Sequence, residues 1–335
     1  MSEQSLRVEI FREILDNGYV PSLGVLITYF NERELLRHCV ESVFLQPEPP
    51  DEIVIYDDAS IYAAKDYLPA DWPVKILVAP TNGGPSRGRN ALLAAAKSEF
   101  IHFHDADDWF HSTWCREVRR RMAMPRVDAV FTEVSSFIDG KKQCEQVIGL
   151  EALAGGGGDL VSFFLLHAML VPSGTYRRSV VQRLGGYRAE LWQSEDFEFH
   201  VRMALSEIRC EWILDPLVNI RLRPESRSQN LPEVWNCRLQ ALRLLFLDLP
   251  PKYYPAMAEA AMGVGSKLFQ IGERKGARQA FRFAKEIGLS DFRKKGLVYH
   301  RIAKLLGPEV AEWMGIAYRH LLPSPLRKWV QRRAA

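Results

Sequence analysis

The sequence has few cysteines and no motif that pairs them. Its five cysteines are odd in number and widely spaced, and none belongs to a C-x-x-C pair. A disulfide framework or a structural zinc site would need a paired arrangement. The cysteines are therefore expected to be buried, reduced thiols.

Long apolar runs are also missing. No stretch approaches the roughly 20 apolar residues that span a bilayer. The first 22 residues carry charges throughout and have no apolar run followed by a small-residue cleavage site, so no signal peptide is expected. These absences predict a cytoplasmic protein, with peripheral contact to the inner face of the membrane left open.

The net charge is small, +3, but it is unevenly distributed. From Lys252 to the C-terminus there are 17 Lys and Arg residues against 6 Asp and Glu, whereas residues 1–251 hold 27 against 35. The acidic and basic regions are expected to meet different partners. Nucleic acid is not expected among them, because the basic residues are not interleaved with a recognisable nucleic-acid-binding motif.

The hydrophobic pattern predicts an α/β domain followed by helices. An amphipathic helix is expected over residues 5–17, and a helix that Asn31 caps follows the first strand. Short apolar strands separated by helices indicate a parallel sheet. The strands are expected at 23–29, 52–56, 74–78, 100–103 and 127–134. Helices alone are expected from about residue 231, at 235–248, 253–271, 275–287 and 296–305.

Acidic residues follow two of the expected strands. Asp57 and Asp58 come directly after EIVIY, and Asp105, Asp107 and Asp108 follow FIHFH. Ligands of parallel α/β sheets bind beyond the carboxyl ends of the strands. Carboxylates gathered there repel one another, so a cation or hydrogen-bond donors are needed to offset their charge.

Five motifs together resemble the family 2 inverting glycosyltransferases, which have the GT-A fold. They are VLITYFNE, IVIYDDAS, NGGPSRGRN, HDADDW and SEDFEF, and the resemblance covers roughly Pro21 to Ser228. It implies a mostly parallel GT-A-like sheet flanked by helices. The expected organisation is an N-terminal helix (1–20), the GT-A domain (21–230), a C-terminal helical appendage (231–320) and a basic tail (321–335).

The resemblance implies a site for a divalent cation, Mn²⁺ or Mg²⁺, at Asp107 with Asp105 near the metal and the ribose. A hard cation on carboxylate oxygens stabilises a departing nucleoside diphosphate. The alternative is that these carboxylates cap a helix at about 108–121. His102 and His104 are expected to be packed or hydrogen-bonded histidines.

Nucleotide contacts are implied at the ends of the first two strands and in the helix after NGGPS. Each contact has an alternative. Tyr29 is alternatively a packing residue, the Asp-Asp pair alternatively forms a turn, and Arg89 alternatively forms only an intramolecular salt bridge. The implied contact residues are Thr28, Tyr29, Glu32, Asp57, Asp58, Arg89 and Asp105.

Asp196, with Glu195 before it, is the expected catalytic pair. An acceptor hydroxyl needs a carboxylate base within hydrogen-bond reach, and the family uses the Asp of its Glu-Asp motif. The alternative is an acidic first turn of a helix and nothing more. Trp192 is a candidate sugar-stacking residue, with core packing equally open.

One position departs from the family pattern. Where many members carry a metal-binding His, this chain has Arg223, which stays protonated and cannot ligate a cation. Arg223 is instead a candidate for contacting the diphosphate, which would reduce reliance on the metal.

The sequence therefore predicts a transferase that moves a sugar from a nucleotide-sugar, with a UDP-sugar expected from the family, to a sugar, lipid-linked or protein acceptor. A nucleotide-sugar-binding protein without turnover is the first alternative. A nucleotidyltransferase is the second, and it lacks support because no glycine- and lysine-rich loop follows the first strand. Two interpretations of the basic C-terminal region stay open: a solvated face of a helical cap, or peripheral contact of the tail, with Trp329 and Val330 among its cations, with an anionic membrane.

Overall fold

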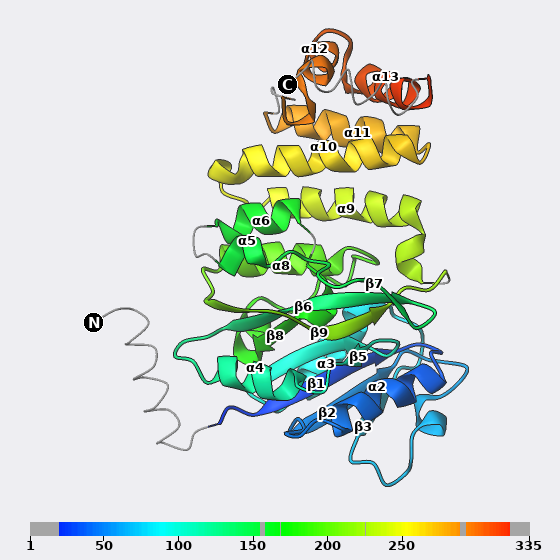
Figure 1. The fold of residues 1–335 in the computed structure, drawn as a ribbon, viewed down its shortest axis with the longest axis vertical. Coiled ribbons are helices and arrows are strands. Elements are labelled where there is room, and N and C mark those ends of the chain that lie inside the picture. Colours follow the sequence, from blue (N-terminus) through cyan, green and yellow to red (C-terminus); the bar gives the residue numbers. More distant parts are fainter. Residues whose placement is uncertain (1–19, 155–157, 168, 225, 289–292, 322–335) are drawn as a thin grey trace. The chain divides into compact units, whose positions relative to one another are not determined.

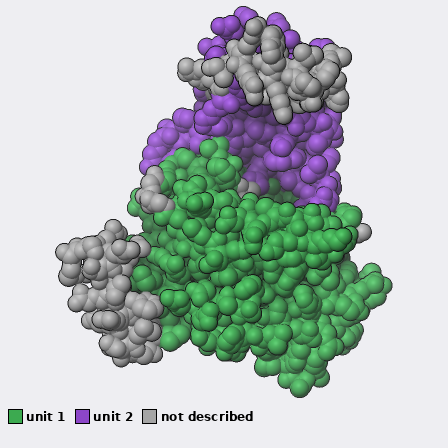
Figure 2. All heavy atoms as spheres, viewed as in Figure 1, with its two compact units in different colours: residues 1–226 green, residues 227–335 purple. Residues whose placement is uncertain are grey.

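The computed structural model describes residues 20–154, 158–167, 169–224, 226–288 and 293–321. The helix expected at 5–17 and residues 322–335 of the basic tail lie outside this part of the chain. The chain divides into two compact units, Met1–Ser226 and Arg227–Ala335 (Figure 2). The domain limits expected from the sequence stay a prediction.

The first unit is built on a mixed sheet. Its strand order is β3-β2-β1-β4-β8-β6-β9-β5, with β7 pairing β6 (Figure 1). The strands are β1 (Leu23–Tyr29), β2 (Glu52–Asp57), β3 (Lys75–Val78), β4 (Phe100–Asp105), β5 (Trp109–Phe110), β6 (Ala129–Ile138), β7 (Lys141–Cys144), β8 (Gly174–Arg177) and β9 (Cys210–Arg221).

Strands β3, β2, β1 and β4 run parallel to one another, and β9 is parallel to β6. Strand β8 is antiparallel to both β4 and β6, and so joins the two parallel groups. The parallel strands are nearly continuous apolar runs because helices cover them. The α/β fold with a mostly parallel sheet and C-terminal helices, expected from the sequence, is confirmed.

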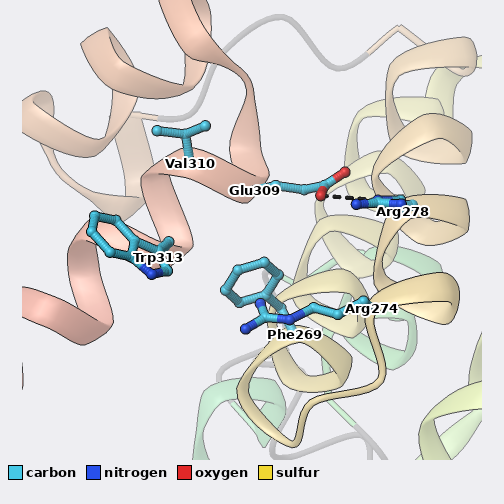
Figure 3. A pocket seen from close by; sticks show the side chains of 6 residues that line it. All are labelled: Phe269, Arg274, Arg278, Glu309, Val310 and Trp313. Atoms are coloured by element: carbon cyan, nitrogen blue, oxygen red, sulfur yellow. Dashed lines mark hydrogen bonds and ion pairs between the residues drawn. The ribbon is translucent and has the colours of Figure 1, made fainter.

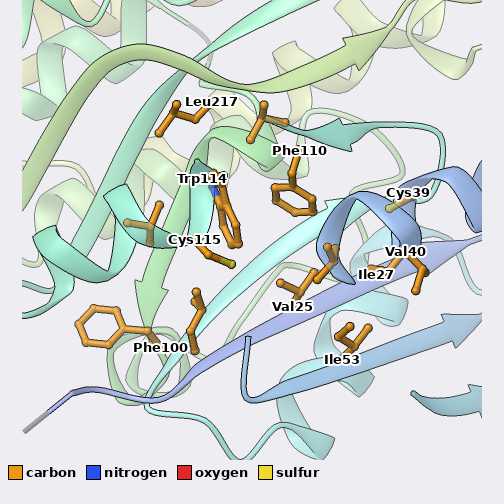
Figure 4. Packing of buried hydrophobic residues seen from close by; sticks show 14 of the residues in the cluster. Val25, Ile27, Cys39, Val40, Ile53, Phe100, Phe110, Trp114, Cys115 and Leu217 are labelled. Atoms are coloured by element: carbon orange, nitrogen blue, oxygen red, sulfur yellow. The ribbon is translucent and has the colours of Figure 1, made fainter. Parts of the chain in front are cut away.

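The helices of this unit flank the sheet. Helix α2 contributes Leu36 and Val40, and α4 contributes Trp114 and Val118, to a core cluster that also holds residues of β1, β2, β6 and β9 (Figure 4). Helix α3 contacts β1 and β2. The helices are α2 (Glu34–Phe44), α3 (Pro85–Ala95), α4 (Trp114–Met122), α5 (Glu151–Ala154), α6 (Leu160–Leu166), α7 (Arg178–Arg183) and α8 (Glu195–Leu205), with 3₁₀ turns η1 (Ala64–Tyr67) and η2 (Val171–Ser173).

The second unit is helical. Helices α10 and α11 form a hairpin through Gly272, whose φ of 90° suits a residue without a Cβ. The helices are α9 (Leu231–Phe246), α10 (Tyr254–Gln270), α11 (Arg274–Glu286), α12 (Leu297–Leu306) and α13 (Pro308–Leu321), with 3₁₀ turns η3 (Arg227–Gln229), η4 (Pro251–Tyr253) and η5 (Arg293–Lys295). Among the described helices, none has the length and hydrophobicity that crossing a membrane requires.

Several local expectations are wrong. Asn31 does not cap α2: the cap position is Arg33, and the Asn31 side chain accepts a hydrogen bond from the Tyr62 amide at 3.1 Å. The helix expected at 108–121 begins only at Trp114, because β5 intervenes. All five cysteines are free, but Cys144 is exposed. Helix α13 was not expected, since its sequence was assigned to the end of the appendage and the start of the tail.

Candidate active site

The candidate site lies where β1, β2 and β4 end. The register pairs Thr28 with Asp105 and Tyr29 with Asp57, so the three strands deliver their polar residues to one edge. The Thr28 hydroxyl donates a hydrogen bond to Asp105 Oδ1 at 2.9 Å. The structure therefore brings the first and the fourth motif into direct contact.

Arg89 joins this edge to the start of α8. Its guanidinium donates to Glu195 Oε1 at 2.6 Å and to Asp105 Oδ1 at 3.0 Å. The arginine side chain is 3% exposed, and that of Glu195 is 10% exposed. A buried guanidinium between two carboxylates holds both in place, and so sets the position of Asp196, the next residue of α8.

The charges in this network shift each other's ionisation. Burial alone would raise the pKa of Asp105, but the Arg89 guanidinium and the Thr28 hydroxyl bring it below its ordinary value. Burial alone would lower the pKa of Arg89, but Asp105 and Glu195 raise it. Asp105 is therefore ionised at neutral pH, as a carboxylate that ligates a metal must be.

Asp107 forms an ion pair with Arg223 across the site. Both Nε and Nη2 of Arg223 donate to Asp107 Oδ2, at 3.0 and 2.5 Å. Burial and the charge of Asp105 raise the pKa of Asp107, while Arg223 opposes that rise. Arg223 stands where many family members carry a metal-binding His. Its side chain binds one oxygen of Asp107, the predicted metal ligand.

The backbone of the acidic loop is held from β9. Asp108 is buried and its Oδ1 accepts a hydrogen bond from the Arg221 amide at 2.8 Å, while Arg221 Nε donates to the Asp107 carbonyl at 3.2 Å. Asp108 therefore anchors the loop and does not cap a helix. Burial, with Asp107 and Asp105 nearby, raises the pKa of Asp108 well above its ordinary value.

Burial and the negative charge of Asp107 raise the pKa of Glu32. Its Oε2 accepts a hydrogen bond from the Phe30 amide, and burial and Asp107 together raise the pKa of Glu32 to about 7. Tyr29 is buried, donates its hydroxyl to the Tyr62 carbonyl at 2.6 Å, and has its pKa raised to about 12 by burial. These contacts favour the packing role that was left open for Tyr29.

The Asp-Asp pair shapes two turns. Asp57 accepts hydrogen bonds from the Ser60 and Ala64 amides, at 2.9 and 2.8 Å. The two oxygens of Asp58 accept from the amides of Gly83 and Gly84, both at 2.8 Å. Both carboxylates thus have structural partners, and a contact of either with a nucleotide stays a prediction.

Gly84 lies against the ring of Trp192. It has a φ of 80°, and a Cβ built there would lie 2.6 Å from Cζ3 of Trp192. The Trp192 side chain remains 43% exposed. A glycine is therefore required for the indole to lie against the NGGPS turn with part of its ring open to a ligand.

Helix α8 starts at the Glu-Asp motif. Ser194 precedes it in the left-handed region with φ of 59°, and Glu195 follows as a buried residue. Asp196 is less buried than Glu195, and its Oδ1 accepts a hydrogen bond from the Phe197 amide at 2.7 Å. Asp196 is the more accessible carboxylate of the two, and Glu195 the positioning one.

Two buried histidines lie behind the acidic loop. His102 is hydrogen-bonded to the Thr175 hydroxyl at 3.1 Å and to His104 at 3.3 Å, and His104 stacks on Phe110. Burial lowers the pKa of both, that of His104 to about 4. They are neutral packing residues, as expected.

The residues present agree with a divalent cation in part. Asp105 Oδ1 and Asp107 Oδ2 have partners in the chain, and the second oxygen of each accepts no hydrogen bond from the described residues. No group of three or more His, Cys, Asp or Glu in the described part of the chain is placed to hold a metal. The two carboxylates therefore suit a cation that takes its remaining ligands from phosphates and water.

Sequence reasoning missed the role of Arg221, which holds the acidic loop through its amide and its Nε. The sequence signal for it is the spacing of two arginines, at 221 and 223, which indicates that both lie near the acidic loop. For Arg89 the sequence predicts a nucleotide contact, with an intramolecular salt bridge as the alternative. The structure shows salt bridges of Arg89 to Asp105 and Glu195, and a nucleotide contact stays a prediction.

Comparison with known proteins identifies relatives of the first unit. Residues 24–185 match the family model described as glycosyl transferase family 2. A putative glycosyltransferase, EpsH of Bacillus subtilis, is 33% identical over 227 residues, which are 62% of this chain and 63% of that protein. The succinoglycan biosynthesis protein ExoO of Rhizobium meliloti is 28% identical over 35% of this chain and 32% of its own length. The chain thus spans less than two thirds of each of these relatives.

Two solved structures share the fold at low sequence identity. TarS 1–349 of S. aureus, in complex with UDP-GlcNAc, has a TM-score of 0.64 at 17% identity and covers 90% of this chain and 93% of its own. The mannosyltransferase PcManGT of Pyrobaculum calidifontis, in complex with GDP-Man and Mn²⁺, has a TM-score of 0.60 at 16% identity and covers 96% and 88%.

Proposed function

Because the chain carries a glycosyl transferase family 2 domain at residues 24–185, we propose that it moves a sugar from a nucleotide-sugar to an acceptor hydroxyl with inversion at the anomeric carbon. The acceptor oxygen attacks that carbon while the bond to the phosphate breaks, and the bonding pair leaves with the nucleoside diphosphate. The proton of the hydroxyl passes to Asp196. A UDP-sugar is the proposed donor, and TarS, which resembles this chain in fold, was solved with UDP-GlcNAc.

The single observation that carries this proposal is the Arg89 bridge. It holds Asp105, at the end of β4, and Glu195, at the start of α8, within 3.0 Å of one guanidinium. The more accessible Asp196 is thereby fixed at the same edge as the acidic loop. A base positioned opposite the leaving group is what a single displacement needs.

We assign the diphosphate end of the donor to the Asp105–Asp107 loop. A divalent cation held by these carboxylates, Mn²⁺ or Mg²⁺, would neutralise the charge of the leaving diphosphate. Arg223, ion-paired with Asp107, adds a fixed positive charge beside it. Thr28 and Glu32 border the loop on the β1 side.

The test is turnover of a nucleotide-sugar panel, followed as nucleoside diphosphate release with Mn²⁺, Mg²⁺ or EDTA. We expect one donor to be used, and Asp196→Asn to lower kcat by about 10²–10⁴-fold, the usual contribution of a general base. Asp215→Asn, an exposed carboxylate on β9, is the matched control and should keep full activity. Unchanged turnover in Asp196→Asn would reject Asp196 as the base.

A second candidate function is nucleotide-sugar binding without transfer. The observation that favours it is the ion pair that occupies one oxygen of Asp107. It predicts donor binding with no diphosphate release, whichever metal and acceptor are added. Membrane contact through the basic tail, a lipid-linked or protein acceptor, and the domain limits at 230 and 320 remain predictions.

A further inference from the structure

The last two helices expose an unusual number of large apolar side chains. In helix α12 and helix α13 these side chains are between 36% and 82% exposed. We call them the α12–α13 surface: Leu297, Val298, Leu305, Leu306, Val310, Trp313 and Met314. Single exposed apolar residues need no explanation, but seven on two adjacent helices do.

The opposite side of α13 is fixed in the interior of the helical unit. Glu312 is buried, and its Oε1 accepts hydrogen bonds from Lys295 at 2.6 Å, Ser266 at 2.5 Å and Tyr299 at 2.9 Å. Ala311 beside it is 2% exposed. An α-helix has 3.6 residues per turn, so Val310, Trp313 and Met314 lie on the side of α13 opposite the buried Glu312. Turning α13 to bury Trp313 would break the Glu312 network.

Cations share the exposed side of α12. Arg301 and Lys304 are exposed, and they lie one and two helical turns after Leu297, on the side of the helix that also carries Leu305. The sequence of α12, LVYHRIAKLL, contains no acidic residue. Apolar side chains interleaved with cations alone are typical of helices that lie in a membrane interface.

A pocket of about 310 Å³ adjoins α13, and its charged lining residues are Arg274 and the ion pair of Arg278 with Glu309. Figure 3 shows Val310 and Trp313 on one side of it, with Phe269 and Arg274 on the other. The Arg274 guanidinium lies 3.7 Å from the centre of the Phe269 ring, and no carboxylate of the described residues is within ion-pair distance of it. An anionic group entering this pocket would therefore meet an arginine that has no acidic partner.

We infer that the α12–α13 surface docks on an anionic lipid bilayer, with Trp313 and its apolar neighbours in the interface and Arg301, Lys304 and Arg274 against the lipid phosphates. Charge complementarity selects this partner. A second copy of the same surface would bring like cations together, whereas an anionic bilayer receives both the apolar and the cationic groups.

The test is flotation of the full-length protein with vesicles of phosphatidylcholine alone or mixed with phosphatidylglycerol. We expect binding to the mixed vesicles only. Arg301→Gln/Lys304→Gln should weaken that binding by about 25-fold, since each cation near an anionic surface contributes about fivefold. Trp313→Ser/Met314→Ser should weaken it by about tenfold or more, through lost apolar insertion.

Each variant has a matched control elsewhere on the protein. Arg116→Gln/Arg120→Gln removes two cations that are 51% and 61% exposed on α4. Leu45→Ser/Leu247→Ser removes two apolar side chains that are 79% and 77% exposed. Both controls should float as the unmodified protein does. Donor turnover without vesicles should be the same in all four variants, so a failure here is separate from a failure of the proposed transferase.

Several results would overturn the inference. They are equal binding to neutral and anionic vesicles, unchanged binding in either surface variant, or equal loss in the controls. Self-association that the Trp313→Ser/Met314→Ser variant abolishes, with no flotation, would assign the surface to a second copy of the chain. On vesicles, brominated lipid should quench the tryptophan fluorescence of the Trp313→Phe variant less than that of the unmodified protein.

Binding that survives in both surface variants but is lost on replacing Arg327, Lys328, Arg332 and Arg333 would assign docking to the tail.

Discussion

Replacing Arg89 by methionine should cost more stability than any single change of an exposed charge in this protein. Methionine keeps most of the buried volume but removes the cation between Asp105 and Glu195. Two carboxylates then face each other with no guanidinium between them. The expected consequence is a protein that folds but is destabilised in a pH-dependent way.

The magnitude follows from the burial of the network. Removing one partner of a buried ion pair costs about 3–5 kcal/mol, because the other charge is left without compensation. Arg89 is 3% and Glu195 is 10% exposed, but Asp105 is 38% exposed and gains solvation from water. We therefore expect the lower end, about 3 kcal/mol, which corresponds to a fall in Tm of about 6–12 °C for a unit of this size.

The pH dependence has a definite sign. In the unmodified protein the pKa of Asp105 lies below its ordinary value, so its contribution to stability is present above the unfolded pKa and is lost as the pH falls through the folded pKa. In the Arg89→Met variant burial dominates and the pKa of Asp105 rises. The stability difference between the two proteins should therefore shrink between about pH 7 and about pH 5.

The assay is urea unfolding of both proteins at these pH values. Arg87→Met, an exposed arginine two residues earlier in α3, is the matched control and should change stability by less than about 0.5 kcal/mol. Adding Asp105→Asn and Glu195→Gln to Arg89→Met should recover most of the loss. A loss that is the same at both pH values, or that the added substitutions do not recover, would refute the electrostatic explanation.

Three further outcomes are expected. In α10, Gly263→Ala meets open space and should stabilise by about 0.5–1 kcal/mol, whereas Gly265→Ala puts a Cβ 2.4 Å from the Phe281 ring and should destabilise by about 1–3 kcal/mol, both measured by thermal unfolding. Burial raises the pKa of Glu32 from 4.5 to about 7, so stability falls as the pH rises across that range, and Glu32→Gln should remove about 2–3 kcal/mol of this fall in urea titrations. Arg223→Ala frees an oxygen of its partner carboxylate and should tighten Mn²⁺ binding about tenfold by electron paramagnetic resonance, and unchanged affinity would contradict a metal at that loop.

Much of the sheet was predictable because its strands are short apolar runs with polar residues directly after them. The run LGVLITY became β1 with the expected bounds, and FIHF became the first four residues of β4, which extends to Asp105. The sequence did not predict strands β8 and β9. Gly174–Arg177 is only four residues long, and Cys210–Arg221 contains a proline and has no regular alternation of polar and apolar residues.

The candidate site was predictable in its members but not in its partners. Motifs named Arg89, Glu195 and Asp107 without saying what they contact, because contacts between residues about a hundred positions apart leave no trace in local spacing. The sequence left helix capping open for Asp108, and its actual partner is the Arg221 amide, which β9 supplies. The prediction that Asn31 caps a helix was wrong for a related reason. Its side chain accepts a hydrogen bond from the distant Tyr62 amide and not from the helix that follows it.

The long sequence separations in this site bear on how the protein is made. Arg89 and Glu195 are 106 positions apart, and Arg223 bonds to Asp107 across 116 positions. A growing chain can pair β1 with β2 and β4 early, but the acidic loop acquires its last partner only after residue 223 has left the ribosome. At about 5–20 residues per second, that leaves several seconds in which Asp107 lacks Arg223. A divalent ion or a chaperone that meets the nascent chain would therefore encounter the Asp107 carboxylate before the arginine that pairs with it.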